Sequence, residues 1–350
     1  MAQKFREWTI KKCIGEGAFG KVFLIEREEF GNVYQAALKV IEIPKDSGDV
    51  KMAVNEGMSK ENVTEYFYGM VKRIVDEFTL MSKLKGNSNI VSYEDHFVQK
   101  KKDKFGWTIF IRMELLTPLY DYMRVNTITV KDVIKLGIDI CHALEICQKY
   151  NIIHRDIKPE NIFISDVGDF KLGDFGIARE LEKTASGLSR VGTKSYIAPE
   201  VYKGLEYNST VDIYSLGLVM YRFLNRNRMP FMPPAPEKIS FSDKERADMM
   251  RFSGQALPKP CNADGRLAEI VLKACAYDPK ERYESAADMK RALEEILYTE
   301  REKQMVYPEG DELENSRAEY LEELKEESSA DGEADVEVDS GTRYLFAQNE

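Results

Sequence analysis

The apolar positions of the first hundred residues follow two different periods. Residues 22–25 and 35–41 are short runs rich in β-branched and apolar residues, separated by a turn at Gly31-Asn32, and they predict two strands. A period of two places Ala37, Lys39 and Ile41 on one face of the second strand. Residues 107–114 predict a further strand. One lysine therefore stands among apolar neighbours in the predicted sheet.

Residues 62–85 carry the strongest helical pattern of this region, because their apolar residues recur at spacings of three and four. Glu77 lies on the apolar stripe of this helix, three residues after Ile74 and four before Met81. A carboxylate in such a place needs a cation or hydrogen-bond donors to remain charged. Glu77 is the second charged residue at an apolar position.

Beyond residue 116 the pattern becomes helical, after a short extended connector that Pro118 favours. Helices are predicted from about residue 133 to 151 and over 209–224, 266–276 and 285–298. We therefore expect an α+β fold with a strand-rich unit at 1–116 and a larger helical unit at 117–298. Residues 299–350 show little periodicity beyond a possible charged helix at 311–327, and we expect them to be mostly disordered.

The charge of the chain is concentrated at its end. The net charge is −10, yet residues 299–350 hold seventeen acidic and five basic residues, which leaves about +2 for the rest. A nearly neutral body gives no reason to expect a nucleic acid as partner. For the acidic tail three roles stay open: binding a basic partner, restraining the rest of the chain, or keeping it soluble.

Cysteine usage and hydropathy indicate the compartment. The five cysteines form no Cys-x-x-Cys pair, so thiols in a reducing cytosol explain them better than disulfides or zinc. No apolar stretch approaches the roughly 20 residues that a membrane span needs. The charged N-terminus lacks the apolar core of a signal peptide. We expect a cytoplasmic protein without a membrane span.

Two short segments carry the most specific chemistry. Residues 154–161 read His-Arg-Asp-Ile-Lys-Pro-Glu-Asn, and residues 174–176 read Asp-Phe-Gly. Asp156 offers a carboxylate that can accept the proton of an attacking hydroxyl, and Lys158 offers a cation for a phosphoryl group. Asn161 and Asp174 offer the oxygen ligands that Mg²⁺ prefers. Together these groups indicate phosphoryl transfer, in which positioning and charge neutralisation supply most of the catalysis.

A glycine-rich loop at residues 15–20 lies between two predicted strands. Gly15, Gly17 and Gly20 allow a backbone to approach phosphates, but a tight hairpin explains them equally well. Lys39 in a neighbouring strand favours the phosphate interpretation, with Glu77 as the partner that orients the lysine. The alternative is that Lys39 reaches solvent along the sheet and Glu77 lies at an edge.

These motifs together resemble those of the Hanks-type (eukaryotic-like) serine/threonine protein kinases, in a soluble bacterial style. The resemblance covers about residues 8–298 in the family's order. It includes the end of the activation segment at 192–200, the buried helix that starts at Asp212, and Arg282 as partner of Glu200. It implies a two-lobed kinase fold with a small antiparallel-sheet lobe, one main helix and a larger helical lobe. Residues 44–68 depart from the family as an insertion, either a docking surface or a solvated helix.

The resemblance also implies ligands and roles. It implies ATP with Mg²⁺, with Mn²⁺ as the alternative metal, and protein substrates with Ser/Thr acceptors. Arg155 before the catalytic Asp implies autophosphorylation of the activation segment, with Ser189, Thr184 or Ser186 as candidates. The implied catalytic residues are Asp156, Lys158, Lys39 and Glu77, and the metal ligands are Asn161 and Asp174. The implied nucleotide contacts are Ile14, Gly15, Gly17, Gly20, Val22, Ala37, Lys39, Met113 as gatekeeper, Glu114, Leu116 and Phe163.

Two rival functions stay open at this point. A pseudokinase scaffold would lack catalysis, but every charged group that the chemistry needs is present. A small-molecule phosphotransferase shares the metal-and-base core, but the segment 192–200 resembles the platform on which protein kinases bind a peptide. Both rivals are therefore less well supported than a protein kinase.

Overall fold

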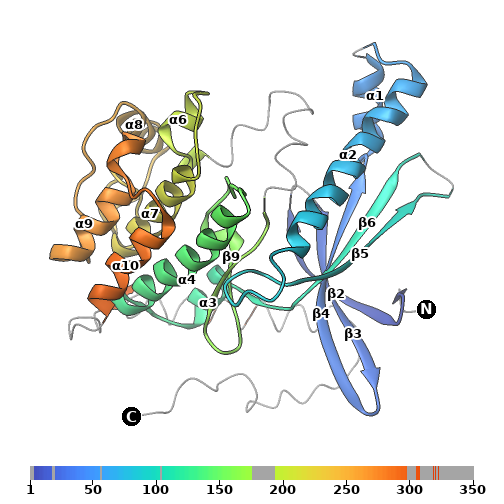
Figure 1. Ribbon diagram of the computed structural model, residues 1–350, viewed down its shortest axis with the longest axis horizontal. Helices are drawn as coiled ribbons and strands as arrows, with labels where there is room; N and C mark the ends of the chain where they lie inside the picture. Colours follow the sequence, from blue (N-terminus) through green and yellow to red (C-terminus); the bar gives the residue numbers. More distant parts are fainter. Residues whose placement is uncertain are drawn as a thin grey trace.

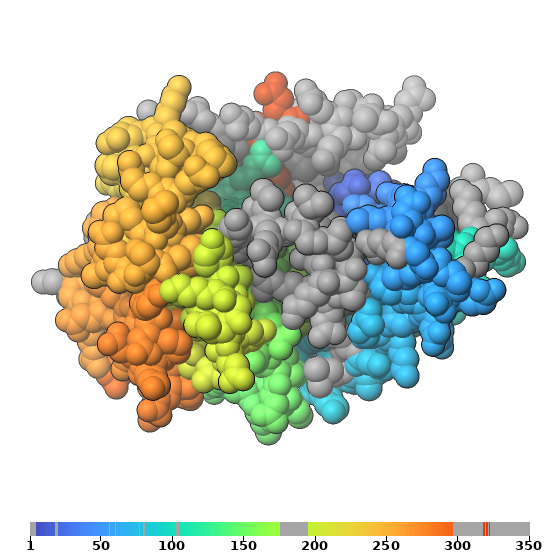
Figure 2. Space-filling model, turned by 90° about the horizontal axis from the view of Figure 1, so that it is seen from above, coloured from blue at the N-terminus to red at the C-terminus, as the bar shows by residue number. Residues whose placement is uncertain are grey.

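The computed structural model describes residues 4–17, 20–55, 57–102, 105–175, 194–297 and 305–307, together with residues 318, 320 and 322. Figure 1 shows a twisted sheet with one long helix beside it and a separate group of helices. From above, the blue-to-cyan residues and the yellow-to-orange residues occupy opposite sides of the molecule (Figure 2). The first group comes from the N-terminal part of the chain and the second from the C-terminal part.

The N-terminal part is built on an antiparallel six-stranded sheet with the order β1-β2-β3-β4-β6-β5. Its strands follow the apolar alternation of the sequence, and the predicted strand at 107–114 is confirmed almost to the residue. The strands are β1 (Lys4–Phe5), β2 (Trp8–Gly17), β3 (Gly20–Glu29), β4 (Asn32–Ile43), β5 (Tyr93–Lys100) and β6 (Trp107–Met113).

The two faces of this sheet enter two separate cores. Ala36 and Leu38 of β4 pack with Phe5 and Trp8 in a small cluster, whereas Ile41 belongs to the main core. This is the alternation expected of a strand. It places Lys39 on the same face as Ile41, and only 9 % of Lys39 is exposed.

The long helix α2 (Lys60–Ser82) follows a shorter helix α1 (Ser47–Asn55). Its apolar stripe, including Ile74 and Phe78, is buried in the same core as Ile41 of the sheet. Residues 44–68 thus contain α1 and the first turns of α2, which extend past the sheet (Figure 1). Their role as a docking surface stays a prediction.

The C-terminal part packs around helix α7 (Thr210–Leu224), whose residues are buried on nearly every side. A helix surrounded in this way forms the centre of a core. α4 (Val130–Lys149) and α9 (Gly265–Ala274) pack on it, and α10 (Ala286–Leu297) packs on α4. The remaining helices are α3 (Leu119–Val125), α6 (Pro199–Tyr202) and α8 (Phe241–Phe252).

Short strands join the site to these helices. β9 (Ile162–Ile164) pairs with β10 (Phe170–Leu172) and with β7 (Thr117–Pro118), the extended connector that Pro118 predicted. β11 (Met305–Tyr307) pairs with β8 (Ile128–Thr129), so three residues of the acidic tail lie on the helical part. Within the described residues, no helix is long and apolar enough to cross a membrane.

Candidate active site

The loop at residues 154–161 is anchored by a carboxylate from the central helix. Asp212, in the first turn of α7, accepts the backbone N–H groups of His154 at 2.7 Å and of Arg155 at 2.8 Å. Arg155 has a positive φ of 65°, an uncommon conformation for a non-glycine residue. The two hydrogen bonds that the Asp212 carboxylate accepts hold the backbone in this conformation. The buried helix that contains Asp212 therefore anchors the loop.

The carboxylate of Asp156 has two different oxygens. Oδ2 accepts a hydrogen bond from Nδ2 of Asn161 at 2.9 Å and forms an ion pair with Nζ of Lys158, also at 2.9 Å. Oδ1 is buried and accepts no hydrogen bond from any described residue. A buried acceptor without a partner is costly, and such groups occur at functional sites. Asp156 is therefore held by one oxygen while the other remains available.

Lys39 of β4 and Asp174 form an ion pair across the two parts of the chain. Partial burial alone would raise the pKa of Asp174, but the charge and hydrogen bond of Lys39 outweigh it and lower that pKa. Asp174 also has a positive φ of 49°, a strained backbone of the kind found at functional sites. The structure thus pairs Lys39 with Asp174. The side chain of Glu77, the partner expected from sequence, lies outside the described residues.

His154 supports both segments from behind. Its Nε2 lies 3.0 Å from the carbonyl oxygen of Gly173, and its ring packs on Phe175 with centroids 4.6 Å apart. Burial is the main reason why the pKa of His154 is lowered to about 4. The imidazole is therefore neutral at physiological pH and donates Nε2–H to the Gly173 carbonyl.

The glycines at the adjoining ends of β2 and β3 fall into two classes. Gly20 has a φ of 132°, and a Cβ there would lie 2.1 Å from the carbonyl oxygen of Val40, so the hairpin itself requires glycine. At Gly17 a Cβ would meet nothing within 4 Å, and at Gly15 only Val22 at 3.8 Å. Packing does not explain these two glycines, which favours the approach of a ligand.

Three of the residues expected to contact the nucleotide, Val22, Ala37 and Met113, are neighbours in the register of the six-stranded sheet. Val22 of β3 lies opposite Lys39, and Ala37 lies opposite Met113 of β6. Ile14 is 39 % exposed on β2, and Phe163 lies on β9. The backbone N–H of Glu114 donates to the carbonyl of Ser92 at 3.1 Å. Leu116 follows Glu114 in the connector between the two parts.

The residues expected from the sequence to bind a cation are Asn161 and Asp174. The backbone N–H of Gly173 donates to the carbonyl of Asn161 at 2.9 Å, which brings the two ligands together. Among the described residues, no group of three His, Cys, Asp or Glu side chains forms a cluster that could hold a metal ion. A small number of oxygen ligands from the protein is suitable for Mg²⁺, because this ion keeps several waters and also binds phosphates.

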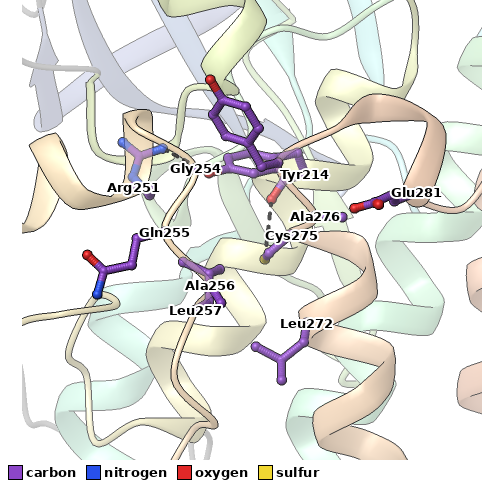
Figure 3. Close-up of a pocket in the computed structure, with 11 residues that line it drawn as sticks. Tyr214, Arg251, Gly254, Gln255, Ala256, Leu257, Leu272, Cys275, Ala276 and Glu281 are labelled. Carbon is purple, nitrogen blue, oxygen red and sulfur yellow. Dashed lines mark hydrogen bonds between the residues drawn. The ribbon is translucent and has the colours of Figure 1, made fainter.

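Beside the site, the segment that ends at Glu200 rests on two buried arginines. Arg282 donates Nη1–H and Nη2–H to the Glu200 carboxylate at 2.6 and 2.8 Å, as predicted from sequence. Arg251 of α8 donates to the carbonyl of Ile197 at 2.7 Å and to the Tyr214 hydroxyl at 3.2 Å. Figure 3 shows Arg251 and Tyr214 at the rim of a cavity of about 380 Å³.

Sequence reasoning missed Arg251, because it lies in a helix whose other residues are largely polar and no spacing marks it. Other residues predicted from the sequence are not among those that the structure describes. Gly176, Gly192 and Thr193 lie outside the described residues, as do the candidate phosphosites Ser189, Thr184 and Ser186.

Several known proteins have sequences that are similar to this chain. A model of the protein kinase domain family matches residues 8–295. A probable serine/threonine-protein kinase of Clostridium perfringens is 27 % identical over 292 residues, which are 83 % of this chain and 38 % of that protein. The serine/threonine-protein kinase PknB of Mycolicibacterium smegmatis is 35 % identical over 164 residues, 46 % of this chain and 25 % of PknB. An Aurora kinase of Saccharomyces cerevisiae is 28 % identical over 282 residues, 79 % of this chain and 66 % of the yeast protein.

This chain belongs to the protein kinase domain family. The two-lobed kinase fold expected from the sequence motifs is confirmed, and the relatives include bacterial serine/threonine-protein kinases. Members of this family use ATP and a divalent metal ion. The chain spans only 38 % and 25 % of the length of the two bacterial relatives.

Proposed function

We propose that this chain is an ATP-dependent protein kinase that transfers the γ-phosphoryl group of ATP to Ser and Thr hydroxyls of proteins. One observation supports this most strongly. Asp156 is held through Oδ2 by Lys158 and Asn161, while the buried Oδ1 lacks a partner among the described residues. This is the arrangement of a base awaiting a hydroxyl proton.

The other residues take roles that follow from their charge and position. Lys158 lies beside the base and stabilises the phosphoryl group during transfer. Lys39 would contact the α- and β-phosphates, with Glu77 as its orienting partner, and Asp174 would be a ligand of the metal ion. Asn161 and Asp174 hold a divalent ion, for which we propose Mg²⁺, and Mn²⁺ is an alternative. The bound ion neutralises charge on the phosphates.

Ile14, Val22, Ala37, Met113 and Phe163 would contact the adenine. The backbones of Glu114 and Leu116 supply its hydrogen bonds, and Gly15, Gly17 and Gly20 cover the phosphates. Since the N–H of Glu114 already bonds to Ser92, its carbonyl is the group that is able to contact the base.

Phosphate transfer tests this function directly. With labelled ATP, Mg²⁺ and a general protein substrate, Asp156→Asn is expected to lower the rate by at least about 100-fold, because general base catalysis contributes about 10²–10⁴. The amide keeps the shape and the contact with Asn161, so nucleotide binding should persist. A wild-type chain that binds nucleotide and transfers no phosphate would favour the pseudokinase alternative.

Regulation by phosphorylation of residues 177–193 is a further part of the proposal. Arg155 is an exposed cation beside the catalytic loop, with its guanidinium 5.6 Å from the ring of Tyr207. A phosphate on Ser189, Thr184 or Ser186 would gain a charge-assisted hydrogen bond from such a cation. Phosphopeptide mapping of active protein should find phosphate in this segment, and an active protein unmodified there would contradict the idea.

The acidic segment 299–350 is proposed to contact a basic partner. Seventeen acidic residues against five basic ones give it a dense negative charge. Removing the segment should weaken transfer to basic protein substrates more than transfer to neutral ones. An equal effect on both would leave solubility as its role.

A further inference from the structure

An ion pair connects two segments that lie at opposite ends of ATP in the proposed function. One is the hinge, proposed to contact the adenine, and the other leads to Asp174, proposed to bind the metal ion. Nζ of Lys171 lies 2.9 Å from Oε1 and 2.8 Å from Oε2 of Glu114. The two side chains are 14 % and 25 % exposed, so solvent screens the pair only in part. Glu114 directly follows the gatekeeper Met113, and Lys171 comes three residues before Asp174.

The same carboxylate also fixes a third segment. Oε1 of Glu114 accepts the backbone N–H of Ser92 at 2.5 Å, and the N–H of Glu114 donates to the Ser92 carbonyl. The Ser92 segment in turn bonds to β10, because Val91 donates to the Leu172 carbonyl at 3.0 Å and Leu172 donates to the Asn89 carbonyl at 2.9 Å. Hydrogen bonds therefore connect the hinge at Glu114, residues 89–92 and β10 to one another.

We infer that Lys171 and Glu114, through their side chains, are positioning residues that set the distance between the adenine-binding hinge and the metal-binding Asp174. This inference rests on the proposed function. Neither side chain is needed to contact the nucleotide. Phe163, a proposed wall of the adenine cleft, lies directly opposite Lys171 in the ladder of β9 and β10. A shift of β10 would therefore move both ends of the nucleotide site.

Physical reasoning gives the direction of the effect. Hydrogen bonds between charged groups are among the strongest in proteins, and removing one partner leaves the other charge partly buried without its partner. Without Lys171 the Glu114 carboxylate keeps only the Ser92 N–H of its described donors. The direct link between the hinge and β10 is then lost, and the backbone hydrogen bonds through residues 89–92 that remain allow a larger shift between them. Such a shift weakens nucleotide binding and leaves acceptor binding unchanged.

The test is the affinity of the full chain for Mg-ATP, measured by calorimetry. Lys171→Met is expected to raise Kd about tenfold, equivalent to about 1.4 kcal/mol, with an unchanged KM for the protein acceptor. Lys171→Arg should stay within about twofold of wild type, because it keeps the charge. Glu114→Gln should raise Kd less, since its amide oxygen still accepts from Ser92. Combining Lys171→Met with Glu114→Gln should add nothing to Lys171→Met alone.

Lys135→Met provides a matched control. Lys135 pairs with Asp139 at 2.6 Å and with Asp169 at 3.0 Å, beside the other end of β10 and away from the hinge. Its loss should lower the unfolding temperature and leave the Mg-ATP affinity within about twofold. Equal affinity in wild type and Lys171→Met would overturn the inference alone. A wild-type chain that binds no nucleotide would overturn the proposed function and this inference together.

Discussion

Glu200 and Arg282 show how single buried side chains support the segment beside the active site. The guanidinium of Arg282 is fully buried and the Glu200 carboxylate nearly so. Replacing Arg282 by Met leaves a buried carboxylate, so we expect a loss of about 3–5 kcal/mol in the free energy of unfolding. Urea denaturation measures this loss. The double variant with Glu200→Gln should recover part of it, and a double variant as unstable as the single one would contradict this explanation.

The neutral His154 predicts a pH dependence of stability. Its pKa is about 4 in the folded protein against a reference value of 6.5. Between these values the unfolded chain binds more protons, so stability is complete above about pH 6.5 and falls as the pH drops toward 4. The loss is on the order of 3 kcal/mol.

Unfolding by urea at several pH values checks the His154 prediction. His154→Phe keeps an aromatic ring against Phe175 but has no titrating group. Its stability should be lower at pH 7 and fall less steeply between pH 6.5 and 4. Equal slopes in the two proteins would show that other groups cause the acid sensitivity.

At the residue scale, the sequence predicted those functional residues that are recognised by their spacing within a short segment. The loop of Asp156, Lys158 and Asn161 is closed within eight residues, so its local sequence largely determines it. The contact between Lys39 and Asp174 joins residues 135 positions apart, and sequence reasoning assigned Lys39 to another partner. No sequence pattern predicted the ion pair of Lys171 and Glu114, since an isolated charged residue on a short strand is expected to be exposed to solvent.

At the scale of elements, apolar periodicity predicted the long helices within a few residues. Helix α2 spans Lys60–Ser82 where 62–85 was expected, and α7 spans Thr210–Leu224 where 209–224 was expected. α8 was missed because most of its residues are polar and only a few are buried. Strand β5 was missed because its sequence, YEDHFVQK, is mostly polar and only Tyr93 is buried. Periodicity therefore finds elements that face the core on a broad stripe and misses edge elements.

The strand β11 leads to a prediction about the tail. Met305 and Tyr307 pair with Thr129 and Ile128 of β8, and Arg124 of α3 lies 4.9 Å from the ring of Tyr320. A chain ending at residue 304 should therefore show faster amide hydrogen exchange in residues 128–129, because their partner strand is gone. Mass spectrometry of the exchanged peptides measures this, with α10 peptides as the control. Unchanged exchange in β8 would show that β11 does not pair in solution.

At the scale of the whole molecule, burial divides the cysteines into two groups. Cys141, Cys147 and Cys275 are buried, whereas Cys13 and Cys261 are exposed, and all five are free thiols. Burial raises the pKa of Cys147 and of Cys275, each to about 12. Thiols react as thiolates, so iodoacetamide at pH 8 should modify Cys13 and Cys261 rapidly and the other three only on unfolding. Rapid modification of all five would contradict this packing.

We propose that this chain joins a nucleotide site, a base and an acceptor platform into one protein kinase site. The most direct measurement follows ADP and phosphoprotein in the same reaction with labelled ATP, Mg²⁺ and a protein acceptor. We expect one phosphate on a Ser or Thr for each ADP formed, and loss of both products in Asp156→Asn. Release of inorganic phosphate instead of phosphoprotein, or equal activity in Asp156→Asn, would contradict it.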